Sequence, residues 1–355
     1  MSWSATCSTP RHVSSRLFKW LERSPAVPGR RGQAPAVCPD GILVGLLRPA
    51  ANRANTRLMR LSLAASLLTL AGTARADNIE DQLGPREIGV GEAMRGGATG
   101  SSAIPLNPAG LPLNRELVFE GGFGYRASDS ASLIGVSACD STNAMPGCFF
   151  YGYAGASPEL DGMSGTRRTH VGGLAVSRQF LPRVLIGQTT KYYDFNSTMV
   201  GEKPASGFAV DLGATVRMTP MINLGLAAQN LFATERTTQF PRTFGGGLFA
   251  RPIPSVAMSF DMRWNLDAEN PTARYGGGLE WFIRSKQNGF PLRFGAVRDN
   301  GLASTYINGG IGMATLKFGI DIGARRQVKN GDETLILASM RFFGPRMSSP
   351  TLDSE

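Results

Sequence analysis

The sequence predicts an all-β fold, a transmembrane antiparallel β-barrel with an N-terminal plug. Its plainest sign is a strict two-residue alternation, in which apolar residues alternate with small, polar or charged ones over 208–218, 256–264 and 316–324. Successive residues of a strand point to opposite faces, so each segment has one apolar and one polar side. Such strands suit a soluble sandwich or a barrel whose apolar side faces lipid. A secretory signal and alternating short and long connections favour the barrel.

The first two segments precede the mature chain. Residues 59–76 combine Arg60, an apolar run from Leu61 to Ala71 and the small-x-small site Ala74–Ala76, which is typical of a signal peptide. The apolar run is shorter than the about 20 residues that a transmembrane helix needs. Residues 1–58 are rich in Arg, Pro and Ser without periodicity. We interpret them as mis-assigned upstream sequence, although a presequence or flexible extension would also fit.

The basic charge belongs mostly to these segments. The formal net charge is +10, but residues 1–58 carry nine basic and two acidic residues, and Arg60 and Arg75 add two positive charges. The remainder, 77–355, is close to neutral. The sequence therefore predicts no nucleic-acid partner.

Residues 77–114 lack strand alternation and are crowded with glycine, so we expect them to form the plug, with a short helix near 88–94. A phosphate-binding loop is the alternative for the glycines at 89–100. No strand precedes them and no Lys-Ser/Thr follows, so close backbone packing inside a barrel explains them better.

The barrel itself is expected over 115–343. Predicted strands are 115–126, 168–180, 183–194, 207–218, 221–230, 242–250, 254–265, 273–284, 290–298, 305–313, 315–325 and 333–343, with weaker runs at 130–138 and 148–155. Parity requires an even number, which is 12 if 115–138 is one strand and 14 if three strands lie between 115 and 155. We favour 14.

Connections and aromatic residues support a membrane location. Short turns near 181–182, 219–220, 251–253, 285–289 and 314 alternate with longer links at 195–206, 231–241, 266–272, 299–304 and 326–332. Outer-membrane barrels have short periplasmic turns and longer extracellular loops. Aromatic residues such as Trp264 and Trp281 lie near strand ends, as in interfacial girdles. The last strand ends on Phe342–Phe343, and a tail, 344–355, follows.

Several motifs resemble the FadL and PorV-like outer-membrane transport superfamily. The clearest is Asn107, Pro108, Ala109, Gly110 and Leu111 after a run of small residues. Weaker matches follow in order at 211–214, 224–227, 229–231, 246–248, 278–280 and 293–295. Together they cover roughly 86–343. The resemblance implies a 14-stranded barrel plugged by its N-terminal hatch, in the bacterial outer membrane.

The resemblance also implies a function. Relatives of the FadL type carry hydrophobic molecules such as long-chain fatty acids passively, binding them in the barrel and releasing them sideways beside the hatch. Expected partners are therefore outer-membrane lipid and a hydrophobic small-molecule ligand, with no cofactor. The alternative is a PorV-like component of a protein secretion system, whose partners would be other secretion proteins.

Charged residues at the polar positions of the strands would line the lumen. These are Asp211, Arg217, Asp261, Arg263, Arg274, Glu280, Arg293, Lys317, Asp321, Arg325 and Arg341. Acids and bases on neighbouring strands would pair and neutralise one another. Alternatively, Arg293 or Arg263 would hold a ligand carboxylate. Asn107 is expected either to fix the hatch to the wall or to take part in gating.

Cysteine and histidine usage argues against other chemistry. Cys139 and Cys148 follow a secretory signal, which favours a disulfide closing a surface loop. Two cysteines without nearby histidines are poor evidence for a metal site. His170 is the single histidine after the signal and has no Gly-x-Ser-x-Gly elbow beside it, so no catalytic site and no enzyme activity are expected.

Overall fold

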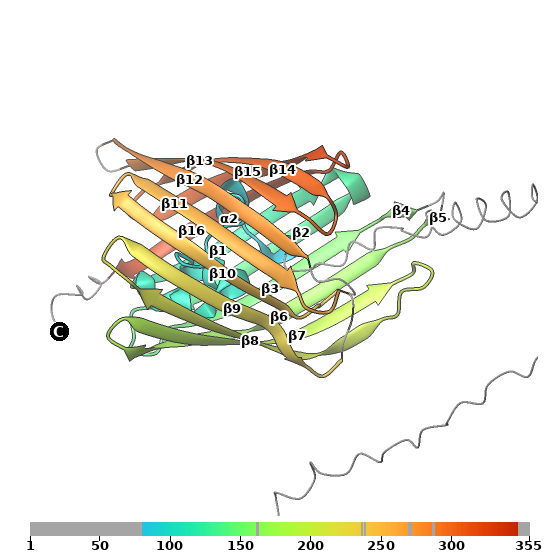
Figure 1. The fold of residues 1–355 in the computed structure, drawn as a ribbon, viewed down its shortest axis with the longest axis horizontal. Coiled ribbons are helices and arrows are strands. Elements are labelled where there is room, and N and C mark those ends of the chain that lie inside the picture. The colour runs from blue at the N-terminus through green and yellow to red at the C-terminus, as the bar shows by residue number, and fades with distance from the viewer. Residues whose placement is uncertain are drawn as a thin grey trace, which may run out of the picture. The chain divides into compact units, whose positions relative to one another are not determined.

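The computed structural model describes residues 80–160, 163–235, 237, 239–268, 272–285 and 288–346. The predicted signal peptide at 59–76 and the upstream segment 1–58 lie outside these residues. The described chain forms one closed antiparallel barrel around an inner segment, residues 80–114 (Figure 1). Among the described residues, no helix is both long and apolar enough to cross a membrane.

Fourteen strands close the barrel, and β1 pairs with β16. They are β1 Glu116–Arg126, β2 Ala131–Asp140, β3 Gly147–Ala156, β6 Arg167–Leu181, β7 Val184–Ser197, β8 Ala205–Arg217, β9 Ile222–Ala233, β10 Thr243–Ile253, β11 Val256–Asn265, β12 Ala273–Ser285, β13 Asn288–Asp299, β14 Ser304–Ala314, β15 Phe318–Lys329 and β16 Thr334–Arg346. The short strands β4 Glu159–Leu160 and β5 Met163–Ser164 form a separate hairpin between β3 and β6.

The strand count of 14 is confirmed, because the two weak runs are strands β2 and β3. The last strand continues past its predicted end at 343. β16 reaches Arg346, which pairs in register with Glu116 and donates from Nε to its carboxylate at 2.9 Å. The predicted tail therefore begins later than 344, and residues 347–355 lie outside the described part.

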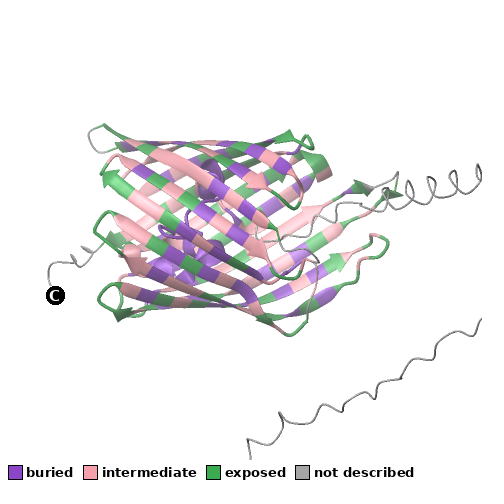
Figure 2. Ribbon diagram, viewed as in Figure 1, coloured by how far each residue is buried: buried purple, intermediate pink, exposed green. Residues whose placement is uncertain are grey.

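Exposure along the strands is the reverse of that in a soluble sandwich. On β11, Phe260 is 55% exposed while its neighbour Asp261 is 2% exposed. On β8, Phe208 is 56% exposed while Asp211 is 1% exposed. Figure 2 shows the resulting bands of exposed and buried residues along the strands. An apolar outer face and a charged inner face are what a barrel in lipid requires. The sandwich alternative is wrong.

The two ends of the barrel differ. One end, here the short-turn end, carries the tight connections such as 182–183, 218–221 and 254–255, together with the start of β1 and the end of β16. The other, the long-loop end, carries the longer links such as 157–166 and 234–242. In outer-membrane barrels the short turns face the periplasm.

The inner segment consists of short helical turns. They are η1 Glu80–Gln82, α2 Pro85–Gly89, η2 Gly100–Ser102, α3 Ala103–Leu106 and η3 Pro108–Leu113. The helix expected near 88–94 instead ends at Gly89. Gly91 and Glu92 have positive φ angles of 70° and 61°, which an α-helix cannot continue through.

The main apolar core lies between the inner segment and the wall. Ile88, Leu106 and Leu111 of the inner segment belong to the same buried cluster as Leu133 and Leu335 of the wall. The same cluster contains the disulfide that joins Cys139 to Cys148. These cysteines are register partners on β2 and β3 and are buried. The predicted disulfide is therefore present: it closes the β2–β3 connection, in which residues 143–145 are exposed, and its own sulfur atoms lie in the barrel core.

Candidate functional site

The Asn107 motif attaches the inner segment to strands β7 and β8. The Asn107 Nδ2 donates to the carbonyl of Ala214 at 3.1 Å and to Thr215 Oγ1 at 2.9 Å. It also donates to the carbonyl of Arg95 at 2.8 Å, while Oδ1 accepts from the N–H of Ala109 at 3.2 Å. This side chain therefore bonds the wall, the inner segment and its own turn together.

Glycines in the wall make this approach possible. A Cβ on Gly187 would overlap the Pro108 backbone, and a Cβ on Gly213 would overlap Oδ1 of Asn107. The other motif residues, Ala109, Gly110 and Leu111, are buried in the same place. Close backbone contact thus requires glycine on the facing strands.

Buried ion pairs continue the attachment around the barrel. On β11, Asp261 Oδ2 accepts from the N–H groups of Met94 and Arg95 at 3.1 and 3.0 Å and from Arg95 Nη1 at 3.0 Å. Within the wall, Lys191 Nζ donates to Asp211 at 2.7 Å. The other oxygen of Asp211 accepts from the N–H of Asn230, where β9 bulges away from β8.

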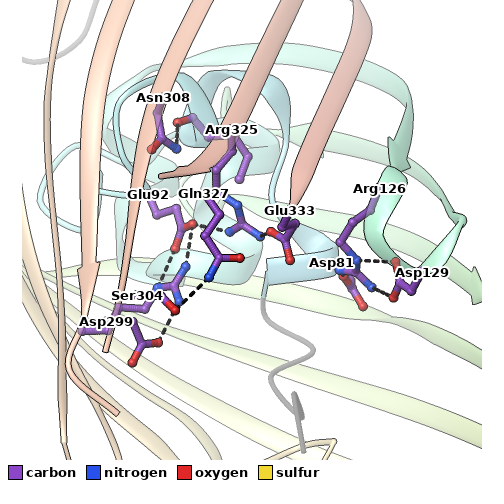
Figure 3. A network of polar contacts seen from close by, with 12 residues as sticks. Asp81, Glu92, Arg126, Asp129, Asp299, Ser304, Asn308, Arg325, Gln327 and Glu333 are labelled. Carbon is purple, nitrogen blue, oxygen red and sulfur yellow. Dashed lines mark hydrogen bonds and ion pairs between the residues drawn. The ribbon is translucent and has the colours of Figure 1, made fainter. Parts of the chain in front are cut away.

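A polar network fills the long-loop end on the β12–β16 side (Figure 3). Glu92 of the inner segment accepts from Arg274 Nη2 at 2.9 Å and from Arg325 Nη1 at 2.6 Å. Arg325 also donates to Glu333 at 2.5 Å, and Arg274 to Asp299 at 2.9 Å. Each of these carboxylates is ion-paired with at least one arginine guanidinium.

A second network lies on β12, β13, β15 and β16. Arg293 donates from Nε to Glu280 at 2.8 Å and from Nη1 to Asp321 at 2.5 Å. Asp321 also accepts from Arg341, and Arg86 of the inner segment lies 3.6 Å from Glu280. Arg293, which we considered as a partner for a ligand carboxylate, is therefore already paired with two carboxylates of the barrel wall. The second candidate, Arg263, is buried opposite Arg274 in register.

Two predicted lumen charges, Lys317 and Arg217, lie at the short-turn end of the barrel. Lys317 is exposed in the turn between β14 and β15, because β15 begins only at Phe318. Its assignment to the lumen wall is wrong. Arg217 ends β8 at the short-turn end, where its Nη2 donates to the carbonyl of Pro182 at 2.6 Å.

Among the described residues, two of the cavities beside the inner segment are large enough to hold a small molecule. The larger, about 1010 Å³, lies at the short-turn end and is lined by arginines such as Arg217, Arg251 and Arg284 with acids such as Glu116. We call it the vestibule. The smaller, about 110 Å³, lies between the inner segment and strands β16, β1, β2, β3 and β6. We call it the apolar cavity.

Missing side chains on the wall create the apolar cavity. Gly122, Gly135 and Gly152 are register partners across β1, β2 and β3, and they lie on the inner face. A Cβ on Gly135 would meet no atom within 4 Å. The residues that line it include the inward-facing Leu133 and Leu337 and also Phe123, Ile134 and Tyr151, whose side chains are exposed.

An apolar cluster lies beside this cavity, toward the long-loop end. Phe240, from the β9–β10 connection, stacks on Tyr193 with ring centroids 4.2 Å apart. Val171 and Phe195 pack with them, and Phe150 borders the same cluster. Val171 and Phe150 also line the apolar cavity, so the two apolar regions are continuous.

Sequence reasoning missed several lumen residues. Glu87, Glu92 and Arg95 lie in the inner segment, where no alternation marks a face. Glu120 and Lys191 lie at polar positions of the alternating strands β1 and β7, so the same pattern could have found them. Among the described residues, no group of three or more His, Cys, Asp and Glu side chains is arranged to hold a metal ion.

Comparisons with known proteins place the fold. No family model matches the sequence, and no curated protein does. Solved structures do match. The CymD monoaromatic hydrocarbon channel is 13% identical with a TM-score of 0.57, over 76% of this chain and 98% of that one. The Pseudomonas putida toluene transporter TodX is 12% identical with a TM-score of 0.58, over 74% and 97%. A Pseudomonas aeruginosa FadL homologue is 9% identical with a TM-score of 0.57, over 73% and 98%.

At these identities the likeness concerns the fold. It agrees with the resemblance in the sequence motifs and with the exposed apolar face of the strands. The chain therefore has the fold of the FadL-like outer-membrane barrels.

Proposed function

We propose that this protein carries small hydrophobic molecules passively across the outer membrane, with the inner segment acting as the plug. The observation that carries the proposal is the row of Gly122, Gly135 and Gly152 across three strands. It leaves an apolar cavity whose lining includes residues of both faces of the wall. A ligand there passes to lipid by a short sideways step.

The entry route runs along continuous apolar contacts. A molecule arriving at the long-loop end first meets Phe240 and Tyr193, then Val171 and Phe150, and then the cavity. Each CH₂ group that leaves water along this route gains about 0.8 kcal/mol. No energy source is needed, because the ligand moves from water to lipid down its own free-energy gradient.

The vestibule is a poor exit for such a ligand. Its lining is rich in charged side chains, including Arg217, Arg251 and Arg284. An apolar molecule that entered the vestibule would lose the free energy gained by burial in the apolar cavity and would still not reach lipid. Sideways release through β1–β3 therefore suits an apolar ligand better than passage to the periplasmic end.

The cavity size favours small ligands. Its volume of about 110 Å³ is comparable to the about 150 Å³ of an engineered apolar cavity that binds benzene. A molecule with one ring matches it, whereas a long-chain fatty acid requires the inner segment to move. The names of CymD and TodX, a monoaromatic hydrocarbon channel and a toluene transporter, fit this size class. The described residues offer no feature that favours the alternative, a secretion component.

Filling the cavity tests the proposal. In Gly135→Leu the new side chain enters open space inside the barrel, so the barrel folds but the cavity is occupied. We expect toluene uptake by intact cells to fall to the level of a deletion strain. Gly121→Leu on β1 is the matched control, because Gly121 lies beside the exposed Phe119 and Phe123 and its Cβ also meets no atom within 4 Å. Equal uptake in wild type, Gly135→Leu and the deletion strain would refute the proposal.

A further inference from the structure

Two arginines of the vestibule, Arg251 and Arg284, have no acidic partner in the part of the chain that the structure describes. Arg251 lies near the end of β10 and Arg284 near the end of β12, and both residues line the cavity. Both are exposed, and neither side chain forms a hydrogen bond or an ion pair with a described residue. By contrast, Arg293 and Arg346 of the same lining each bind a glutamate. Two guanidinium groups are therefore available to a molecule in the vestibule.

The carboxylate whose charge acts on Arg251 is already shared. It belongs to Glu280, whose Oε2 accepts from Arg293 Nε at 2.8 Å and lies 3.6 Å from Arg86 Nε. The positive charges of Arg86 and Arg284 act on Arg251 as well, and they repel it. No carboxylate in contact therefore balances the charge of Arg251 among the described residues.

The vestibule as a whole carries excess positive charge. Among the described residues, seven arginines and four glutamates line it. Asp321, which is not part of the lining, binds Arg293 and Arg341 and adds one more carboxylate. The arginines still outnumber the carboxylates. A cavity lined mainly by one sign of charge attracts ions of the other sign and raises their local concentration. The vestibule therefore favours anions.

Aromatic rings hold the two unpaired guanidiniums. The Arg251 guanidinium lies over the Phe249 ring, with its carbon 5.6 Å from the ring centroid. The Arg284 guanidinium lies over the Phe282 ring at 5.9 Å. A guanidinium is planar, so contact with a ring leaves N–H groups at its edge available to an oxyanion. Each arginine is thus positioned without a charged partner and keeps donors for a ligand.

Glycines make room for both rings. A Cβ built on Gly97 of the inner segment would overlap the Phe249 ring, and a Cβ built on Gly289 of β13 would overlap the Phe282 ring. Any larger residue at either position would displace the ring and, with it, the arginine above. Two strands and the inner segment therefore cooperate in placing the guanidiniums, which distinguishes them from arginines that are merely exposed.

We propose that Arg251 and Arg284 form a binding site for a polyvalent oxyanion that enters the vestibule from the short-turn end. The ligand class is a small molecule with two or more carboxylate or phosphate groups, because two planar guanidiniums can each bind such a group through two hydrogen bonds. The cavity of about 1010 Å³ accommodates a molecule of this kind. The inference goes beyond the proposed function, since this ligand does not pass through the apolar cavity.

Three anions test the site: tricarballylate, pyrophosphate and acetate. Their affinities are measured by calorimetry for the full barrel in nanodiscs of zwitterionic lipid, with empty nanodiscs subtracted. We expect the wild type to bind both polyvalent anions more tightly than acetate, and to bind them more weakly as the NaCl concentration rises. Arg251→Gln and Arg284→Gln should each weaken tricarballylate about tenfold, because each removes a hydrogen bond between charged groups. Arg251→Lys keeps the charge but loses the planar fork, so it should weaken tricarballylate less than Arg251→Gln does.

A control variant separates this site from a general effect of charge. Arg178 is exposed on β6 near the same end of the barrel but is not part of the vestibule lining, so Arg178→Gln should bind tricarballylate as tightly as the wild type. Heat-modifiable gel mobility checks that each variant is folded. Acetate binding as tightly as tricarballylate, or an unchanged tricarballylate affinity in both Arg251→Gln and Arg284→Gln, would overturn the anion site.

Discussion

Asp261→Asn tests whether buried charge holds the inner segment in the barrel. The carboxylate accepts two backbone N–H groups and the guanidinium of Arg95, and both side chains are almost fully buried. An asparagine keeps an oxygen for the N–H groups but leaves the Arg95 charge unpaired. Removing one partner of a buried ion pair costs about 3–5 kcal/mol.

That cost should appear as local opening. The strand ladders do not depend on this pair, so the barrel stays closed while residues 85–110 detach more often. At about 1.4 kcal/mol for each factor of ten, the detached fraction rises by about two to three and a half orders of magnitude. Hydrogen exchange of this segment measures that change, and single-barrel conductance in a planar bilayer measures the resulting openings.

A second variant isolates the charge. Adding Arg95→Met to Asp261→Asn removes the orphan cation, and an uncharged pair of similar shape is often as stable as the ion pair. We expect the double variant to recover most of the exchange protection and the low conductance. Wild-type behaviour of Asp261→Asn, or a double variant as open as the single one, would refute the reasoning.

Two further predictions concern the ends and the core of the barrel. Phe240→Ala removes the ring stacked on Tyr193 and should speed the initial toluene uptake of intact cells, whereas the exposed Phe232→Ala should leave it unchanged; slower uptake in Phe240→Ala would argue against the entry route. Replacing both Cys139 and Cys148 by alanine should lower the free energy of unfolding in urea by about 2–4 kcal/mol, measured by loss of heat-modifiable mobility, and an unchanged midpoint would contradict this.

The two-residue alternation in the sequence predicted most of the strands and which of their residues face inward. A strand fixes the direction of each side chain through its two-residue period, so residues such as Phe260 and Asp261 could be assigned to opposite faces from the sequence. The same logic failed for Lys317, because a turn ends the alternation just before Phe318. The helix expected near 88–94 was wrong for a separate reason, because positive φ angles at Gly91 and Glu92 end α2 early.

The partners of the lumen charges were beyond prediction for a different reason. Asp261 pairs with Arg95, which is far away in the sequence and lies in a segment without strand periodicity. Such a pair depends on how the inner segment threads through the closed barrel, not on local pattern. Glu87 and Glu120 likewise come near each other only because α2 packs inside the barrel against β13–β16, and β16 is the neighbour of β1 in the closed sheet. Sequence reasoning therefore placed charges on the wall but could not say which groups they pair with.

The uneven attachment of the inner segment explains why a ligand would enter on one side. Toward β8, β11, β12 and β15 the segment is held by directional bonds from Thr215, Asp261, Arg274 and Arg325. Toward β1–β3 its contacts are mainly apolar between the Asp81–Arg126 ion pair at the long-loop end and the hydrogen bond from Ser101 to Glu120. A directional ion pair is lost when a molecule intrudes, whereas an apolar contact is replaced by a similar one with the ligand. An apolar ligand therefore displaces contacts of the inner segment at the lowest free-energy cost beside the glycine row, where the wall is also thinnest.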